Sequence, residues 1–215
     1  WIHGPSQDNP IKNLADISGC KYFVTNDNNI YIFDPDGTEW SDEKIEKVEG
    51  IWEEAIDNVD EELYNSDRRS LKDAIKDIYP EALNNKGVLW ALSAYNEFSM
   101  GGSIEKLSAV YHDDGKEYNN PDVIITNGYD LVIKKLSNGL DIKLNTTVKD
   151  IDISMKNGVK IKTEFSNYEA DFVICSVPLG ILKKQKINFI PKLPRKHRNS
   201  INKIGFGSVT KIAMK

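Results

Sequence analysis

Two residues of this sequence, His3 and Lys211, are candidates for moving protons or stabilising charge. His3 lies in the loop-like run WIHG, and an imidazole with a pKa of about 6.5 can hydrogen-bond a partner in either protonation state. Lys211 lies in GFGSVTK, on one side of an alternating, strand-like pattern. A lone loop histidine is more often solvated, and a strand lysine is often only a surface residue. The surroundings of both residues must therefore decide what they do.

Composition limits the classes of partner. The chain has 215 residues, a net charge of −5 and an isoelectric point of about 5.3, which argue against a general surface for nucleic acid or anionic membranes. The excess of acidic residues is compatible with cationic substrates, but it is small and is therefore weak evidence for them. The basic runs Lys183–Lys186 and Lys192–Arg198 lack interleaved aromatic residues and are interpreted as solvated surface. We expect no nucleic-acid partner and, without a long apolar run, no membrane partner.

The two cysteines, Cys20 and Cys175, form no disulfide framework and lack metal-ligand spacing, so no metal site is expected. Cys175 lies within an apolar run. Buried free thiols are the expected state, and they are typical of a reducing compartment, which favours a cytoplasmic location.

The stretch that organises the chain is YEADFVICSVPLGILKKQKINF, Tyr168 to Phe189. Its first half is rich in β-branched and aromatic residues and ends at Pro178. An apolar run of this kind predicts an inner strand, buried on both faces, of a layered α/β or α+β domain. Ligands in such folds bind just outside the carboxyl end of a strand. The simpler interpretation is a core strand with a proline stop.

The first half of the chain predicts mainly helices. Asn9 and Pro10 begin a helix that Gly19 ends, and residues 20–40 form a hairpin with turns at 26–29 and 34–37. Three further helices are predicted over Ser41–Asn65, Ser70–Tyr79 and Pro80–Phe98. The first of these has ten Asp and Glu residues on its outer face, a solvated surface by the usual interpretation.

The second half predicts short strands and turns. After Ser108 the segments AVYHDDGKEY and DVIIT are strand-like, and Gly128–Leu136 is predicted as a helix with Tyr129, Leu131, Val132 and Leu136 inward. Strands are then predicted over Leu140–Ile153, Val159–Phe165 and Tyr168–Val177, with a hairpin turn at Asn157-Gly158, and a last strand over SVTKIAMK.

Four blocks, taken in order, resemble the flavin-dependent amine oxidases, the family of polyamine oxidases, monoamine oxidases and lysine-specific histone demethylases. The blocks are WIHGPSQDNPI, TNGYDLVIKKLSNGLDIKLNTTVKDIDI, YEADFVICSVPLGILKKQKINF and PKLPRKHRNSINKIGFGSVTKIAMK. The resemblance covers the first 19 residues and nearly all of 105–215. The resemblance does not extend to about residues 26–100.

The resemblance implies an α+β fold, part of a two-domain FAD enzyme. The expected divisions are 1–20 in the FAD-binding domain, 21–135 in a largely helical substrate-binding domain, 136–190 as a β-meander that returns to the FAD-binding domain, and 191–215 as the start of a second substrate-domain segment. The chain has no GxGxxG, the glycine loop that binds the FAD pyrophosphate. We therefore expect an internal fragment that, by itself, is inactive and does not hold FAD tightly.

The resemblance also implies roles for the residues of the WIHG block. Trp1, Ile2 and Gly4 are expected beside the flavin ring, with Gly4 letting the backbone come close to it. His3 is expected to face the substrate amine, as in polyamine oxidases. Monoamine oxidases and the demethylases depart from this histidine, so it favours a polyamine substrate.

Three further residues take their expected roles from the resemblance. Val148, on its own pattern only an edge strand residue, would pair its backbone with the adenine of FAD. Pro178 would turn the chain where the cofactor needs room. Lys211 would hold a water against flavin N5 and stabilise electron density there.

The function implied is oxidation of an amine C–N bond by hydride transfer to flavin, hydrolysis of the imine by water, and reoxidation by oxygen with release of hydrogen peroxide. One alternative is a non-catalytic binding module with the family's fold. Another is a related flavin enzyme with a different substrate, such as a protoporphyrinogen oxidase or a carotenoid desaturase. The WIHG and GFGSVTK blocks favour amines over those substrates.

Overall fold

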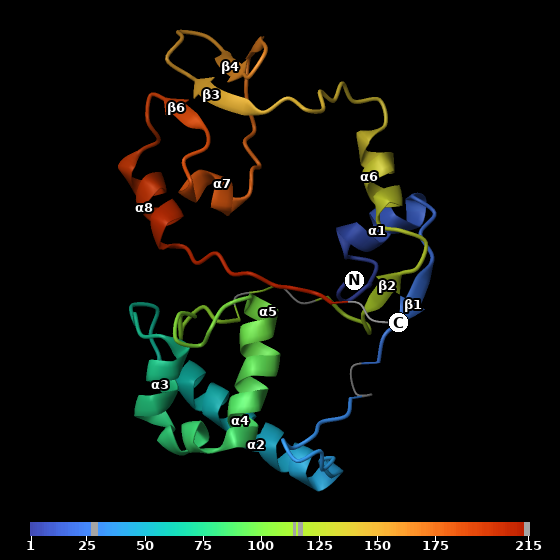
Figure 1. The fold of residues 1–215 in the computed structure, drawn as a ribbon, viewed down its shortest axis with the longest axis vertical. Helices are drawn as coiled ribbons and strands as arrows, with labels where there is room; N and C mark the ends of the chain where they lie inside the picture. Colours follow the sequence, from blue (N-terminus) through green and yellow to red (C-terminus); the bar gives the residue numbers. More distant parts are fainter. Residues whose placement is uncertain (27–29, 114, 116–117, 213–215) are drawn as a thin grey trace.

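A computed structural model describes residues 1–26, 30–113, 115 and 118–212. Figure 1 shows a helical block, a small N-terminal unit and a sheet unit, with the last stretch of chain crossing between them. The helical block contains α2 (Asp42–Glu62), α3 (Leu71–Ile78), the 3₁₀ helix η1 (Pro80–Asn84), α4 (Lys86–Ala91), the π-helix η2 (Leu92–Glu97) and α5 (Phe98–Met100). Helix and sheet are segregated, which confirms the predicted α+β class.

Local capping explains where these helices begin. The side chain of Ser41 accepts the Lys44 amide at the start of α2, and the side chain of Ser70 accepts an amide at the start of α3. The predicted single helix over residues 80–98 is instead interrupted at Asn85. Its Oδ1 accepts the amides of Gly87 and Val88 at 2.9 and 3.4 Å, so that α4 starts as a new helix.

The main core lies in this helical block, because the apolar stripes of its helices face one another. Its largest fully buried side chains are those of Val59, Leu71, Ile75, Val88 and Leu92. Two smaller cores lie in the N-terminal unit and in the sheet unit.

The N-terminal unit contains α1 (Pro10–Ile17), β1 (Tyr22–Val24), β2 (Val123–Ile125) and α6 (Asp130–Ser137). Strand β1 pairs antiparallel with β2, about a hundred residues further on, so the hairpin predicted within residues 20–40 is wrong. An alternating pattern of apolar residues indicates that a segment is a strand, but it does not indicate which strand pairs with it. Here the partner is the apolar strand β2. The turn at 34–37 is present, whereas that at 26–29 lies largely outside the described residues.

Helix α6 matches its prediction in position but not in burial. Val132 is buried, yet Tyr129 and Leu136 are 41% and 52% exposed. Few elements pack against α6 within the described chain, and α1 is the main one. Among the described residues, no helix is long and apolar enough to cross a membrane.

The sheet unit holds four strands in the order β5-β4-β3-β6, covered by two helices. The elements are β3 (Val148–Asp152), β4 (Val159–Thr163), β5 (Asn167–Ala170), α7 (Leu179–Lys183), β6 (Asn188–Ile190) and α8 (Arg195–Lys203). Strands β3, β4 and β5 form the predicted antiparallel meander, but β6 returns parallel to β3, which the sequence pattern did not indicate. The connection through α7 makes this parallel pairing feasible.

The predicted inner strand over Tyr168–Val177 is wrong after Ala170. Phe172 and Ile174 are 88% and 93% exposed, and Cys175 is exposed rather than buried. An apolar run predicts burial, but burial requires a neighbouring strand. The described part of the chain places none beside residues 172–177.

The final segment, residues 204–212, runs from α8 across the helical block towards the N-terminus (Figure 1). The strand predicted over SVTKIAMK is absent from residues 208–212, and residues 213–215 lie outside the described part. The segment instead touches Gly101, the residue that follows α5: a Cβ built at Gly207 would lie 1.5 Å from the carbonyl oxygen of Gly101. Only glycine allows two backbones to approach so closely.

Candidate functional site

The WIHG block is anchored by one residue of β2. The Ile2 amide donates to the Val123 carbonyl at 2.8 Å, and the Val123 amide donates back at 3.1 Å. The Ile2 side chain is buried, whereas those of Trp1 and His3 are exposed. Because side chains alternate along extended backbone, Trp1 and His3 project to the face opposite Ile2.

Gly4 is required by a close backbone approach. Its φ is +55°, and an added Cβ would lie 2.0 Å from the carbonyl oxygen of Tyr118. The close approach that the structure shows is thus to the backbone of Tyr118. The Asn9 side chain donates to the carbonyls of His3 and Gly4 at 2.9 and 3.2 Å, which fixes the backbone of the block beside α1.

Asp122, which immediately precedes β2, contacts the block directly. Its Oδ2 is hydrogen-bonded to Nδ1 of His3, and its Oδ1 accepts the Gly4 amide at 3.0 Å. Sequence reasoning did not single out this residue. A carboxylate beside a strand is common, and only the pairing of Ile2 with Val123 brings it to the histidine.

Lys211 and Trp1 meet although they lie at opposite ends of the chain. The Lys211 Nζ lies 4.7 Å from the centroid of the Trp1 ring. A cation within about 6 Å of an indole face is attracted by the ring's quadrupole. The structure therefore brings three of the predicted site residues, Trp1, His3 and Lys211, to the same region.

A cleft of about 780 Å³ opens between the helical block and residues 208–210, next to Lys211. Its volume lies within the range of small-molecule sites. It is lined by Trp90, Ser93, Ala94, Glu97, Phe98, Gly101, Gly102, Ser103, Ser208, Val209 and Thr210. Hydroxyl groups, one carboxylate and two aromatic rings therefore surround the space.

Glu97 supplies the carboxylate of this cleft. It ends the π-helix η2, a rare element that occurs often at functional sites. Its Oε1 accepts the Ile104 amide at 2.9 Å and its Oε2 accepts the Ser93 hydroxyl at 3.0 Å, so the group is oriented. Each oxygen keeps a further lone pair for a cationic ligand. In the sequence Glu97 looked like any polar residue of a helix.

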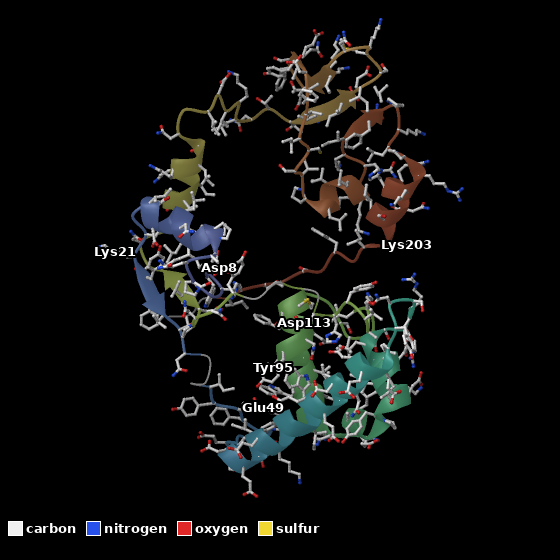
Figure 2. All side chains as sticks on the ribbon, turned by 180° about the vertical axis from the view of Figure 1, so that it is seen from behind. Asp8, Lys21, Glu49, Tyr95, Asp113 and Lys203 are labelled. Atoms are coloured by element: carbon white, nitrogen blue, oxygen red, sulfur yellow. The ribbon has the colours of Figure 1, made fainter. Side chains whose placement is uncertain are left out.

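Aromatic packing holds η2 in place. The Tyr95 ring contacts Trp52 and Trp90 edge-on, at centroid distances of 4.9 and 5.6 Å. Its hydroxyl donates to Glu49 on α2 at 2.6 Å, and both side chains are labelled in Figure 2. Burial, together with this carboxylate, raises the pKa of Tyr95, so the hydroxyl stays a donor.

Two predicted cofactor contacts, Val148 and Pro178, lie in the sheet unit and not beside Trp1. Val148 starts β3, and β6 pairs only with Asp150–Asp152. Within the described residues, no strand covers that side of β3 at Val148, so a backbone edge is open there. Pro178 is exposed and immediately precedes α7.

The two groups of residues offer different binding chemistry. The open backbone edge at Val148 offers hydrogen-bond donors and acceptors. The indole of Trp1 and the ammonium of Lys211 suit a flavin ring, which is aromatic and becomes electron-rich on reduction. In the described chain, no three His, Cys, Asp or Glu side chains are grouped so as to hold a metal ion.

Known proteins similar to this chain include flavin-containing enzymes. The sequence model of the family described as "Flavin containing amine oxidoreductase" matches residues 1–215. Polyamine oxidase 4 of Oryza sativa subsp. japonica is 28% identical over all of the chain and 47% of its own length. Lysine-specific histone demethylase 1 homolog 2 of Arabidopsis thaliana is 35% identical over 55% of the chain. The chain spans about half the length, or less, of these relatives.

Solved structures show the same fold. Wild-type putrescine oxidase bound to putrescine superposes on 94% of the chain with a TM-score of 0.68 and 17% sequence identity. The chain covers 51% of that structure. With the family's sequence matched from the first residue to the last, the chain belongs to the flavin-containing amine oxidoreductases.

Proposed function

We propose that the protein containing this chain is an FAD-dependent amine oxidase that acts on polyamine-type substrates. The observation that carries the proposal is the contact of Lys211 with Trp1 beside the cleft that contains Glu97. The proposal is also supported by the similarity of the whole chain to a polyamine oxidase and by the fold that it shares with a putrescine oxidase.

The chemistry divides between cofactor and protein. Trp1 and Lys211 would hold the flavin ring, whose chemistry would be to accept two electrons from the substrate and to return them to oxygen with release of hydrogen peroxide. The oxidised substrate is an imine, which water hydrolyses to an aldehyde and a shorter amine. Lys211 provides fixed positive charge where negative charge develops, and its contact with Trp1 holds its ammonium group in place.

The cleft binds the rest of the substrate. A polyamine carries several ammonium groups separated by methylene chains. The oriented carboxylate of Glu97 accepts hydrogen bonds from one ammonium, and the rings of Trp90 and Phe98 contact the methylene chain. His3 lies beyond Trp1 on the same face and hydrogen-bonds the reacting nitrogen.

The test uses the whole protein, purified with its flavin. Peroxide release is measured with spermine, N-acetylated spermine and benzylamine, and flavin reduction is followed by stopped flow. Replacing Lys211 by Met slows the flavin steps by roughly a hundredfold and leaves spermine binding nearly unchanged. Lys203→Met, an exposed lysine of α8, serves as control. A protein without flavin absorbance is a non-catalytic module, and preference for benzylamine contradicts the polyamine assignment.

A second candidate substrate is a methylated lysine side chain within a peptide. The observation that favours it is the higher identity, 35%, to a lysine-specific histone demethylase homologue over 55% of the chain. Both substrates present a secondary or tertiary amine to the same site. A dimethyl-lysine peptide assayed beside spermine distinguishes them through the ratio of kcat/KM.

A further inference from the structure

Asp122 holds the histidine of the site from one side only. Its carboxylate bonds Nδ1 of His3 through Oδ2 and the Gly4 amide through Oδ1. The Asp122 side chain is 23% exposed, against 81% for His3. The aspartate is therefore fixed within the fold, while the other edge of the imidazole ring faces open space.

The hydrogen-bond chemistry selects one form of the ring. An ionised carboxylate only accepts hydrogen bonds, so Nδ1 of His3 must be the donor. In the neutral imidazole the proton then resides on Nδ1, and Nε2 has a free lone pair. The main chain is held by hydrogen bonds between the backbones of Ile2 and Val123 and by the Asn9 side chain, which donates to the His3 carbonyl. These bonds do not restrain rotation of the imidazole ring, so that restraint comes from Asp122.

We propose that Asp122 is a positioning residue for His3 and keeps Nε2 unprotonated towards the substrate amine. The inference rests on the proposed amine oxidation, in which the reacting nitrogen must be neutral. Nε2 takes a proton from the substrate ammonium: one N–H bond breaks and the Nε2–H bond forms. The imidazolium so formed stays paired with the Asp122 carboxylate, as in other carboxylate–histidine pairs.

The isosteric variant Asp122→Asn gives a clear test. Its amide oxygen can still accept the Gly4 amide, but its NH₂ group then faces Nδ1, which must become an acceptor. The tautomer of His3 therefore reverses, with the proton on Nε2. Nitrogen-15 NMR of the histidine rings in the flavin-loaded protein reports this without substrate, and the signal that His3→Ala removes is that of His3.

Kinetics complete the test with spermine as the probe. Loss of one hydrogen bond to an ionised group predicts a fall in kcat of roughly ten- to a hundredfold for Asp122→Asn, with KM and flavin content little changed. The double variant His3→Ala/Asp122→Ala should be no slower than His3→Ala alone, because Asp122 acts through His3. Asp141→Asn, an exposed aspartate paired only with Lys143 in the described structure, is the matched control.

Two results overturn the inference. One is an Nδ1–H tautomer that persists in Asp122→Asn. The other is a double variant whose loss is the product of the two single losses, which shows that Asp122 acts independently of His3. Asp122→Glu keeps the carboxylate and restores part of the rate if the inference holds. A reversed tautomer in a protein that oxidises no amine supports the positioning and contradicts only the proposed function.

Discussion

Replacing Gly207 by alanine should displace Lys211 without touching it. A Cβ at Gly207 would lie 1.5 Å from the Gly101 carbonyl oxygen, whereas real Cβ contacts are not shorter than 3.0 Å. The two backbones must therefore separate by about 1.5 Å, because neither atom belongs to a side chain that can rotate away. Lys211 lies four residues further along the same segment and shifts with it.

The expected effect follows from the displacement. A misplacement of about 1 Å at a reacting group can cost roughly a hundredfold in rate. That factor corresponds to about 2.7 kcal/mol of activation free energy. We therefore expect kcat/KM for spermine to fall about a hundredfold in Gly207→Ala, measured by peroxide release and by the rate of flavin reduction in stopped flow.

The same segment offers a matched control. A Cβ at Gly205 would meet no atom within 4 Å, so Gly205→Ala should keep both flavin content and rate. The melting temperature and circular dichroism of both variants show whether they fold. If Gly207→Ala folds, retains flavin and turns over spermine as fast as Gly205→Ala, the contact with Gly101 does not position Lys211 and the reasoning is refuted.

Three further predictions concern capping, acid stability and substrate binding. Asn85→Ala removes the cap of α4 and should lower the free energy of unfolding by about 1 kcal/mol. This corresponds to a fall of about 2–4 °C in the melting temperature for a chain of this size. An equal fall in the adjacent variant Asn84→Ala would contradict the capping role of Asn85. Arg69 holds the pKa of Asp67 below its usual value, so this pair stabilises the fold above about pH 4 and the stabilisation is lost as the pH falls through the lowered pKa. Urea midpoints of wild type and Asp67→Asn between pH 3 and 6 should therefore converge at the acid end, and a constant gap would refute the assignment. Glu97→Gln should raise the KM for spermine roughly tenfold with little change in kcat; an unchanged KM would exclude Glu97 from substrate binding.

Local features of the sequence were predicted well because their causes are local. Asn9, Ser41 and Ser70 each accept amides two or three residues further on, so the type and spacing of neighbouring residues suffice to place these helix starts. The amphipathic pattern of α2 likewise specifies its own buried face. The family also followed from ordered blocks of sequence, and the match along residues 1–215 confirms it.

Contacts between distant segments were decided only by the tertiary structure. The strand pattern of residues 22–24 did not name β2 as its partner, and the apolar run after Ala170 did not ensure a neighbour to bury it. The approach of Lys211 to Trp1 and of Asp122 to His3 joins residues that are far apart along the chain. Hydrophobic alternation encodes which face of a segment is apolar, but the geometry of packing determines which segment meets that face.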